Sequence, residues 1–260
     1  MATSLGPLRG GPGSAAIVAT CPGPPHEPGV TALEVVRSGS RPTLDESFAL
    51  ALQECYARHG VQEFVPPVAH DEHPLVRLVI VRDDNGVLLG GGRVHAHHAR
   101  LGFPAETTLR HFPEPRAWVR SLGQDGSAEL SALWVRSNSG GIARLVVQAC
   151  IATAIALGKR TVFTLSHERF GGVLATAGMM PVGACPELPL PGPGWRARLF
   201  AAELPGCARA SRFDREIIST IAAQVSRGAE HMLLNQLTSI EQGYTGWTVR
   251  RTTTRMRGVA

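Results

Sequence analysis

The stretch that decides the fold covers residues 128–146 and reads AELSALWVRSNSGGIARLV. Its first part, residues 128–135, alternates in polarity, as a β-strand with one buried face does. A glycine pair then precedes an apolar run over residues 142–157, and this run is typical of a buried helix. The run contains Arg144 and Gln148 and is shorter than the roughly 20 apolar residues needed to cross a bilayer. We therefore expect a strand, a glycine turn and a buried helix, with no membrane span.

The segments around this stretch predict a mixed sheet. Residues 159–165 form a short β-branched run and residues 168–176 a second helix, so the parallel strands on either side of residues 142–157 are joined by a right-handed crossover. Upstream, two β-branched runs flank Asn85-Gly86, a pair that suits a tight hairpin turn. The predicted fold class is therefore α+β, with a mixed central β-sheet flanked by helices.

The two ends of the chain differ from the middle. Residues 1–30 are mainly Gly, Pro, Ser and Ala, and we predict that they are disordered. The predicted domain covers residues 31–204, with residues 98–126 irregular because of their prolines. Residues 205–260 are predicted to form a helical arm and a basic tail, with an amphipathic helix or helix pair over residues 213–240 that serves as a packing arm or a homodimer contact.

Charge and cysteine usage exclude several classes of function. The formal net charge is +5, but four arginines lie in the tail, and without them the charge is +5 − 4 = +1. Aromatic residues make up 5% of the chain, so nucleic-acid binding is not expected. Nucleic-acid binding through the basic tail is the weakest of the alternative functions. Five scattered cysteines suit reduced thiols in a cytoplasmic protein and form no zinc motif.

The glycine turn before residue 142 is a candidate phosphate-binding site. Backbone N–H groups at a glycine turn and helix N-terminus can receive phosphate oxygens, although a Gly-Gly pair before a helix is more often only a tight turn. The lysine of a Walker motif and the three-glycine dinucleotide fingerprint are both missing, so neither an NTP nor NAD is favoured.

At this turn the sequence resembles the Gcn5-related N-acetyltransferase superfamily. That family has a strand, an Arg/Gln-x-x-Gly-x-Gly/Ala turn that binds the pyrophosphate of an acyl-CoA, and a long helix. Asn138 stands where the family has Arg or Gln, and AGMMPVG at residues 177–183 is similar to a later family segment. Leu174 stands where many members have a tyrosine general acid. The resemblance implies a donor site made by Val135, Asn138, Gly140, Gly141, Ile142 and Ala143.

A narrower resemblance is to the acyl-homoserine lactone synthases and related N-acyl amino acid synthases. It is carried in order by LQECY at residues 52–56, Gly92-Arg93, the proline-containing residues 104–112 and Glu129-Leu130-Ser131. The resemblance implies acyl-CoA or an acyl carrier protein as donor. Lactone synthases have an arginine where this chain has Ala132, and their acidic pair has no clean counterpart here, so N-acylation of an amino acid or other small amine fits better.

Acyl transfer to an amine needs a base and donors for the developing oxyanion. Glu129 is the predicted base. An equally weighted alternative is that the Glu129 carboxylate only pairs with Arg93 or faces solvent. Arg93 is predicted to bind a substrate carboxylate, with His95 and Ser131 completing the polar wall of the substrate site. His167 is an alternative base, although a capping role suits its position better.

Three further expectations complete this prediction. A nearby arginine disfavours a metal at His95, His97 and His98, so no metal is expected. The alternative functions are an acetyl-CoA-dependent N-acetyltransferase and a non-catalytic protein that retains the fold and binds an acyl thioester. The partners expected are a small amine and, in one form of the donor, an acyl carrier protein.

Overall fold

The computed structural model describes residues 30–233 except 62–72, 100, 125, 137–139 and 191–193. The strands are β1 (Val30–Arg37), β2 (Val76–Asp83), β3 (Leu88–Ala96), β4 (Ser127–Val135), β5 (Thr161–His167), β6 (Met180–Pro181), β7 (Ala197–Glu203) and β8 (His231–Leu233). The α-helices are α1 (Pro42–Ala57), α2 (Pro104–Thr108), α3 (Pro113–Gln124), α4 (Gly140–Ala156), α5 (Gly171–Thr176) and α6 (Arg212–Ser226), and the 3₁₀ turns are η2 (His73–Leu75) and η3 (Glu168–Phe170). None of the helices described is long and apolar enough to span a membrane.

The strands form one mixed sheet in the order β6-β7-β5-β4-β3-β2-β1-β8. The only parallel pair in the described sheet is β4 with β5, and α4 connects them, as the sequence predicts. These two strands pair over three positions, from Ser127 with Thr161 to Glu129 with Phe163. Beyond Glu129 each strand continues without a ladder to the other, so one long edge of β4 is left open toward β5.

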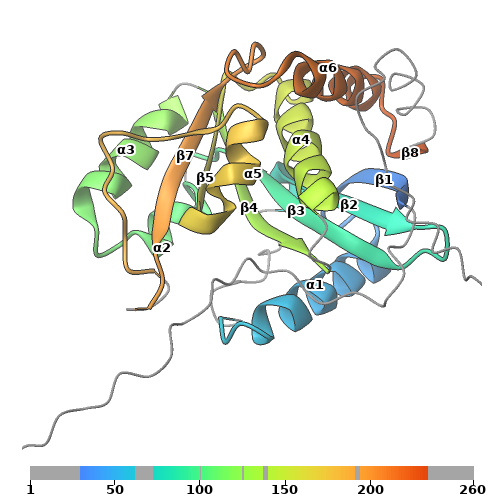
Figure 1. The fold of residues 1–260 in the computed structure, drawn as a ribbon, viewed down its shortest axis with the longest axis horizontal. Helices are drawn as coiled ribbons and strands as arrows, with labels where there is room; N and C mark the ends of the chain where they lie inside the picture. Colours follow the sequence, from blue (N-terminus) through green and yellow to red (C-terminus); the bar gives the residue numbers. More distant parts are fainter. Residues whose placement is uncertain are drawn as a thin grey trace, which may run out of the picture.

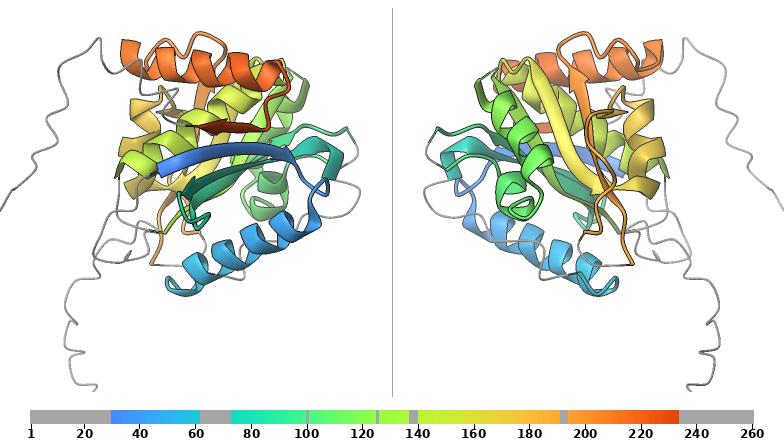
Figure 2. Two further views of the ribbon diagram at one scale, coloured as in Figure 1. Left: turned by 90° about the vertical axis from the view of Figure 1, so that its right-hand side faces the viewer. Right: turned by 90° about the vertical axis from the view of Figure 1, so that its left-hand side faces the viewer.

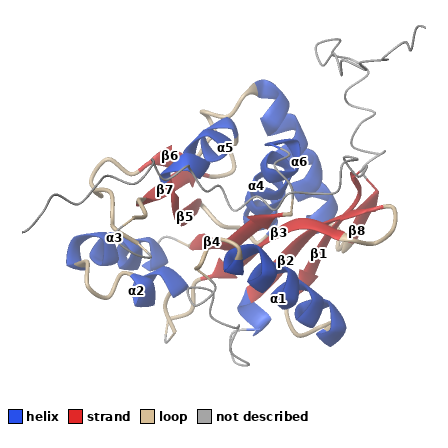
Figure 3. Cartoon of the chain, turned by 60° about the horizontal axis from the view of Figure 1, so that its bottom comes forward, coloured by secondary structure: helices blue, strands red, loops and turns tan. Residues whose placement is uncertain are grey.

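Helices cover both faces of the sheet (Figures 1 and 2). Helix α4, with α5 and α6, lies on one face and forms the largest apolar core, which includes Leu130, Val146 and Ile221. Helix α1 lies on the other face and packs Phe48 and Leu52 against β2, β3 and Trp134 of β4. Helices α2 and α3 cover the part of that face near β5 and β7 (Figure 3).

The prediction that residues 98–126 are irregular was wrong, because they contain α2 and α3. Pro104 and Pro113 begin these two helices. A proline is well suited to the first helical turn, since its missing N–H has no intrahelical acceptor there. The same prolines that suggested an interrupted segment therefore mark helix starts.

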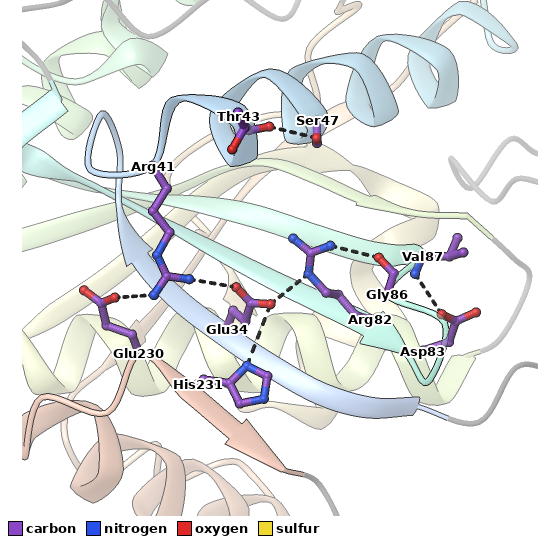
Figure 4. Close-up of polar contacts among 10 residues, drawn as sticks. All are labelled: Glu34, Arg41, Thr43, Ser47, Arg82, Asp83, Gly86, Val87, Glu230 and His231. Atoms are coloured by element: carbon purple, nitrogen blue, oxygen red, sulfur yellow. Dashed lines mark hydrogen bonds and ion pairs between the residues drawn. The ribbon is translucent and has the colours of Figure 1, made fainter.

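The C-terminal segment also differs from its prediction. Helix α6 ends at Ser226, and the chain returns as β8, which pairs antiparallel with β1, instead of continuing as a helix to residue 240. A charged cluster links β1, β2, β8 and Arg41, the residue just before α1 (Figure 4). Glu34 accepts from Arg82 at 2.8 Å, and Arg41 joins Glu34 to Glu230 at 3.4 and 2.7 Å. The residues after 233, including the predicted basic tail, lie outside the described part of the chain, and the division at residue 204 stays a prediction.

A glycine run in β3 lets both helical layers approach the sheet. A Cβ atom on Gly91 would lie 2.5 Å from the Val79 carbonyl oxygen and 2.8 Å from Phe48 Cε2. The first of these contacts is with backbone, which cannot rotate away. Gly91 therefore allows the α1 face to close over β2 and β3.

We expect Gly91→Ala to lower the free energy of unfolding by about 2 kcal/mol, because the added methyl group overpacks this interface. Gly172→Ala, in α5 with no atom within 4 Å of the new Cβ, is the matched control and should be neutral or slightly stabilising. Urea denaturation of the two variants tests this, and equal midpoints would contradict it.

Candidate functional site

Four polar side chains of the predicted site lie on two neighbouring strands. In the antiparallel ladder between β3 and β4, Arg93 is opposite Ser131 and His95 is opposite Glu129. Side chains two residues apart in a strand share a face, so all four belong to one face of the sheet. It is the α1 face, since the Arg93 guanidinium carbon lies 5.6 Å from the centre of the Phe48 ring. The structure therefore brings the predicted base and substrate-binding residues together.

Glu129 is the last residue of β4 that pairs with β5, and its side chain is buried. Its Oε2 accepts a hydrogen bond of 3.0 Å from the backbone N–H of Ala105 in α2. Burial raises the pKa of Glu129 to about 8, the Ala105 N–H opposes this rise, and Glu106 adds to it. A carboxylate with such a pKa is a much stronger base, when ionised, than an exposed glutamate. The suggested pairing of Glu129 with Arg93 stays a prediction.

His95 is neutral at ordinary pH. Burial, assisted by the nearby Arg93 charge, lowers its pKa to about 3. Its Nε2 is buried and has no hydrogen-bond partner among the described residues. A neutral imidazole beside Glu129 adds no positive charge that would lower the carboxylate pKa, so His95 helps to preserve the basicity of Glu129.

His167 lies at the far end of β5, four residues beyond the last pair with β4. Its Nδ1 accepts a hydrogen bond of 3.1 Å from the Arg169 N–H and so caps η3, and its ring lies 5.2 Å from that of Trp195. Burial and the nearby Arg169 lower the pKa of His167. The structure thus gives it a capping role apart from the four residues on β3 and β4, and a catalytic role for it stays a prediction.

Strand β4 carries a bulge directly after Ser131. Arg93 is opposite Ser131, whereas Gly91 is opposite Trp134, so β4 has one residue more than β3 over this interval. Ala132 has a φ of 50°, in the left-handed region that an alanine rarely adopts. A bulge of this kind bends the strand that carries it, and no pattern in the sequence indicates it.

Two carbonyl groups of β4 beyond the bulge accept hydrogen bonds from α1. The Tyr56 hydroxyl donates to the Leu133 oxygen at 3.2 Å, and the Cys55 thiol donates to the Val135 oxygen at 3.6 Å. Burial raises the pKa of the Tyr56 phenol above its ordinary value. Sequence reasoning assigned no role to Tyr56, although it belongs to the LQECY motif that supported the resemblance.

The predicted donor turn is described only in part. Asn138 lies outside the described residues, while Gly140 and Gly141 begin α4 and are exposed, and Ile142 and Ala143 are buried below them. The first turn of a helix has N–H groups without intrahelical acceptors, at the positive end of the helix dipole. An exposed first turn made of two glycines leaves room for a phosphate group to approach it.

Arg144 and Leu174 have structural roles. Arg144 of α4 makes two hydrogen bonds to Asp214 of α6, at 2.6 and 2.7 Å, so its charge is directed to the helix packing. Leu174 is fully buried in the α4 core, and the tyrosine that many acetyltransferases have there has no counterpart at that position. Among the residues that the structure describes, no three His, Cys, Asp or Glu side chains are grouped to hold a metal.

Comparisons with known proteins bear on the fold. No family model matches the chain, and no curated protein matches its sequence. Among solved structures, FeeM, an N-acyl amino acid synthase from uncultured soil microbes, has a TM-score of 0.50 and 14% identity, over 68% of this chain and 95% of FeeM. The CoA-dependent acyl-homoserine lactone synthase BjaI, in a complex with SAM and isopentyl-CoA, has a TM-score of 0.48 and 12% identity, over 74% of this chain and 90% of BjaI.

The acyl-homoserine lactone synthase LasI has a TM-score of 0.49 and 16% identity, over 69% of this chain and 92% of LasI. The likeness to FeeM confirms the predicted α+β fold, with a mixed central sheet flanked by helices.

Proposed function

We propose that the chain is an N-acyltransferase that moves an acyl group from a phosphopantetheine thioester to the amine of an amino acid or another small amine. The donor is acyl-CoA or an acyl carrier protein. The observation that carries the proposal is the buried Glu129, with a pKa of about 8, at the point where β4 and β5 separate. FeeM, which has the same fold, is an N-acyl amino acid synthase, and this supports an amino acid as acceptor.

In the proposed reaction, Glu129 acts on the attacking amine. An ammonium group must lose a proton before its nitrogen can attack a carbonyl carbon, and the ionised Glu129 accepts that proton directly or through a water. The nitrogen–carbon bond then forms, the thioester oxygen takes up negative charge, and the carbon–sulfur bond breaks to release the thiolate. The released thiolate takes the second proton of the amine nitrogen, which leaves a neutral amide, and Glu129 returns its own proton to solvent before the next cycle.

The open edge of β4 suits the donor. A phosphopantetheine arm contains amide groups, and an unpaired strand edge can hydrogen-bond to them as to an added strand. Beyond Glu129 this edge has no ladder to β5. The arm would run toward Val135 and the first turn of α4, where Gly140 and Gly141 would receive phosphate oxygens.

Arg93 is proposed to bind the carboxylate of the acceptor, with Ser131 and His95 beside it. A guanidinium group can hold a carboxylate through two parallel hydrogen bonds, which fixes the orientation of the amine. A lactone product is not favoured, because Ala132 lies in the bulge where lactone synthases have an arginine. Asp83-Asp84 is not a clean counterpart of the acidic pair of lactone synthases. The Asp83 carboxylate accepts hydrogen bonds from the Asn85 and Val87 N–H groups of the β2–β3 hairpin, at 3.0 and 2.8 Å.

A comparative mass-spectrometric profile tests the proposal. Organic extracts of cells that express the wild-type chain should contain new amide-linked acyl compounds, and extracts of cells with Glu129→Gln should lack them. The products identify the acceptor and the acyl length together. If no acyl product appears with either chain, and the purified protein binds acyl-CoA without releasing thiol, the non-catalytic alternative is correct.

We expect Gly141→Val to weaken the binding of coenzyme A by about tenfold, because a branched side chain on the first turn of α4 blocks the approach of phosphate to the N–H groups. Gly172→Val is the matched control, since Gly172 also lies near the start of a helix, with no atom within 4 Å of a new Cβ. Calorimetric titration of both variants with coenzyme A measures the effect. Equal affinity in the two variants would place the pyrophosphate elsewhere.

A further inference from the structure

Helix α1 is attached to the part of β4 that lies beyond the bulge. The Tyr56 hydroxyl donates to the Leu133 oxygen and the Cys55 thiol to the Val135 oxygen. On the same helix, the Phe48 ring packs edge-on against Trp134, with 6.0 Å between ring centres. These contacts join residues 77 to 86 positions apart in the chain, so they are a feature of the tertiary fold.

The two carbonyl groups lie on the open edge of β4. The Arg136 N–H donates to the Leu89 oxygen of β3 at 2.7 Å, so the backbone of Arg136 is directed toward β3. Polar groups of successive strand residues are directed alternately to the two edges, and the N–H and C=O of one residue share an edge. Leu133 and Val135 therefore direct both groups away from β3, toward the side on which β5 has separated.

Hydrogen bonds from α1 decide which backbone groups this edge can offer to a ligand. The carbonyl oxygens of Leu133 and Val135 are already occupied by donors from α1, whereas the N–H groups of the same residues are directed to the same edge. An edge of this kind favours a ligand that brings hydrogen-bond acceptors, such as the carbonyl oxygen of a thioester. It also stabilises the negative charge that develops on that oxygen during acyl transfer.

We propose that Tyr56 is a positioning residue for the thioester donor. It holds the Leu133 carbonyl, and with it the extended backbone just beyond the bulge, so that the Leu133 N–H on the preceding peptide group stays directed to the reacting carbonyl. This inference rests on the proposed acyltransferase function. It is supported by the bulge, because Ala132 has a conformation that persists only where surrounding contacts enforce it, and the bond from Tyr56 is made to the next residue. Burial keeps the phenol protonated, so it remains a donor at every working pH.

The test compares Tyr56→Phe with the wild-type chain. The substitution keeps the ring that packs against β4 and removes only the hydroxyl donor. With octanoyl-CoA and the standard amino acids as substrates, we expect kcat to fall about tenfold or more, while the KM for the amine is unchanged, because misplacement of reacting groups lowers turnover more than acceptor binding. Backbone amides of residues 131–135 should exchange hydrogen faster than in the wild type. Ser47→Ala, which removes a hydroxyl from α1 that donates only to Thr43 of the same helix, is the matched control.

Three outcomes are distinguishable. Slower turnover and faster exchange in Tyr56→Phe, with Ser47→Ala unchanged, would support the positioning role. Wild-type kcat in Tyr56→Phe would overturn it, whatever the exchange rates. A wild-type chain that neither binds coenzyme A nor releases thiol with any amine would overturn the proposed function, and with it the role of Tyr56, while the exchange rates would still report whether the phenol holds β4.

Discussion

Replacing Glu129 by glutamine is expected to reduce the rate of acyl transfer by about a hundredfold or more, because the amide cannot accept the proton of the amine. Glutamine retains the size of the side chain and an oxygen that can accept from the Ala105 N–H, so the fold is preserved. In the wild-type chain, kcat/KM should rise as the pH increases through about 8, where Glu129 ionises. Steady-state thiol release measured as a function of pH checks both expectations.

Glu129→Gln, which should lower activity, should raise the stability of the fold at high pH. The pKa of Glu129 is raised from 4.5 to about 8 in the folded chain, so the folded state binds more protons than the unfolded state between these values. The contribution of Glu129 to stability is therefore fully present below about pH 4.5 and is lost as the pH rises through about 8. Glu129→Gln lacks this loss, so its melting temperature should exceed that of the wild type at about pH 9 and match it at about pH 5.

Glu216→Gln is the control for both measurements, since Glu216 lies on α6 and pairs with the exposed Arg212. It should leave both the pH profile of activity and the pH dependence of melting unchanged. If Glu129→Gln retains wild-type turnover, Glu129 is not the base. If its melting temperature follows that of the wild type at both pH values, the carboxylate is not desolvated in the folded chain.

Asp214→Ala is expected to lower the free energy of unfolding by about 3 kcal/mol, because it removes one member of a buried charged pair. The Asp214 carboxylate is fully buried between α4 and α6. It accepts hydrogen bonds from Arg144 at 2.6 and 2.7 Å, from Gln148 at 2.6 Å and from the Ser211 hydroxyl. Urea denaturation of the variant and of the wild type measures the loss.

The pH dependence of the Asp214 contribution follows from its pKa. Burial alone would raise this pKa, but the hydrogen bonds from Arg144, Ser211 and Gln148 lower it below the usual 3.8. The stabilisation is therefore present above about pH 4 and is lost as the pH falls through the lowered pKa. Glu216→Gln, which breaks an exposed pair on the same helix, should change the unfolding free energy by less than about 1 kcal/mol. A similarly small effect of Asp214→Ala would show that α6 is held to α4 by apolar packing alone.

Local sequence patterns predicted most of the fold. The Asn85-Gly86 hairpin and the crossover through α4 depend on neighbouring residues and were predictable. Helices α2 and α3 were missed, because a proline has the same appearance in an irregular segment and at the first turn of a helix. Strand β8 was missed because its pairing with β1 depends on residues about 200 positions earlier.

The grouping of side chains at the candidate site was predictable to a similar extent. Glu129, Arg93, His95 and Ser131 were identified from two strands, and alternation along those strands places them on one face. The Ala105 N–H that contacts Glu129 and the Tyr56 hydroxyl on Leu133 come from distant elements, so no local pattern could indicate them. The bulge at Ala132 was not predictable either, since alanine has no preference for the conformation it adopts there.

Because β4 and β5 pair over only three positions, a small change of angle at this junction produces a larger displacement at the far end of β4. Strand β4 continues for six residues beyond Glu129, and at about 3.3 Å per residue its end lies about 20 Å from the junction. A rotation of about 5° at the junction would therefore move the end of β4 by almost 2 Å, more than one carbon–carbon bond. If an acyl chain lies between the diverging strands, the residues that set their angle would select its length without touching it.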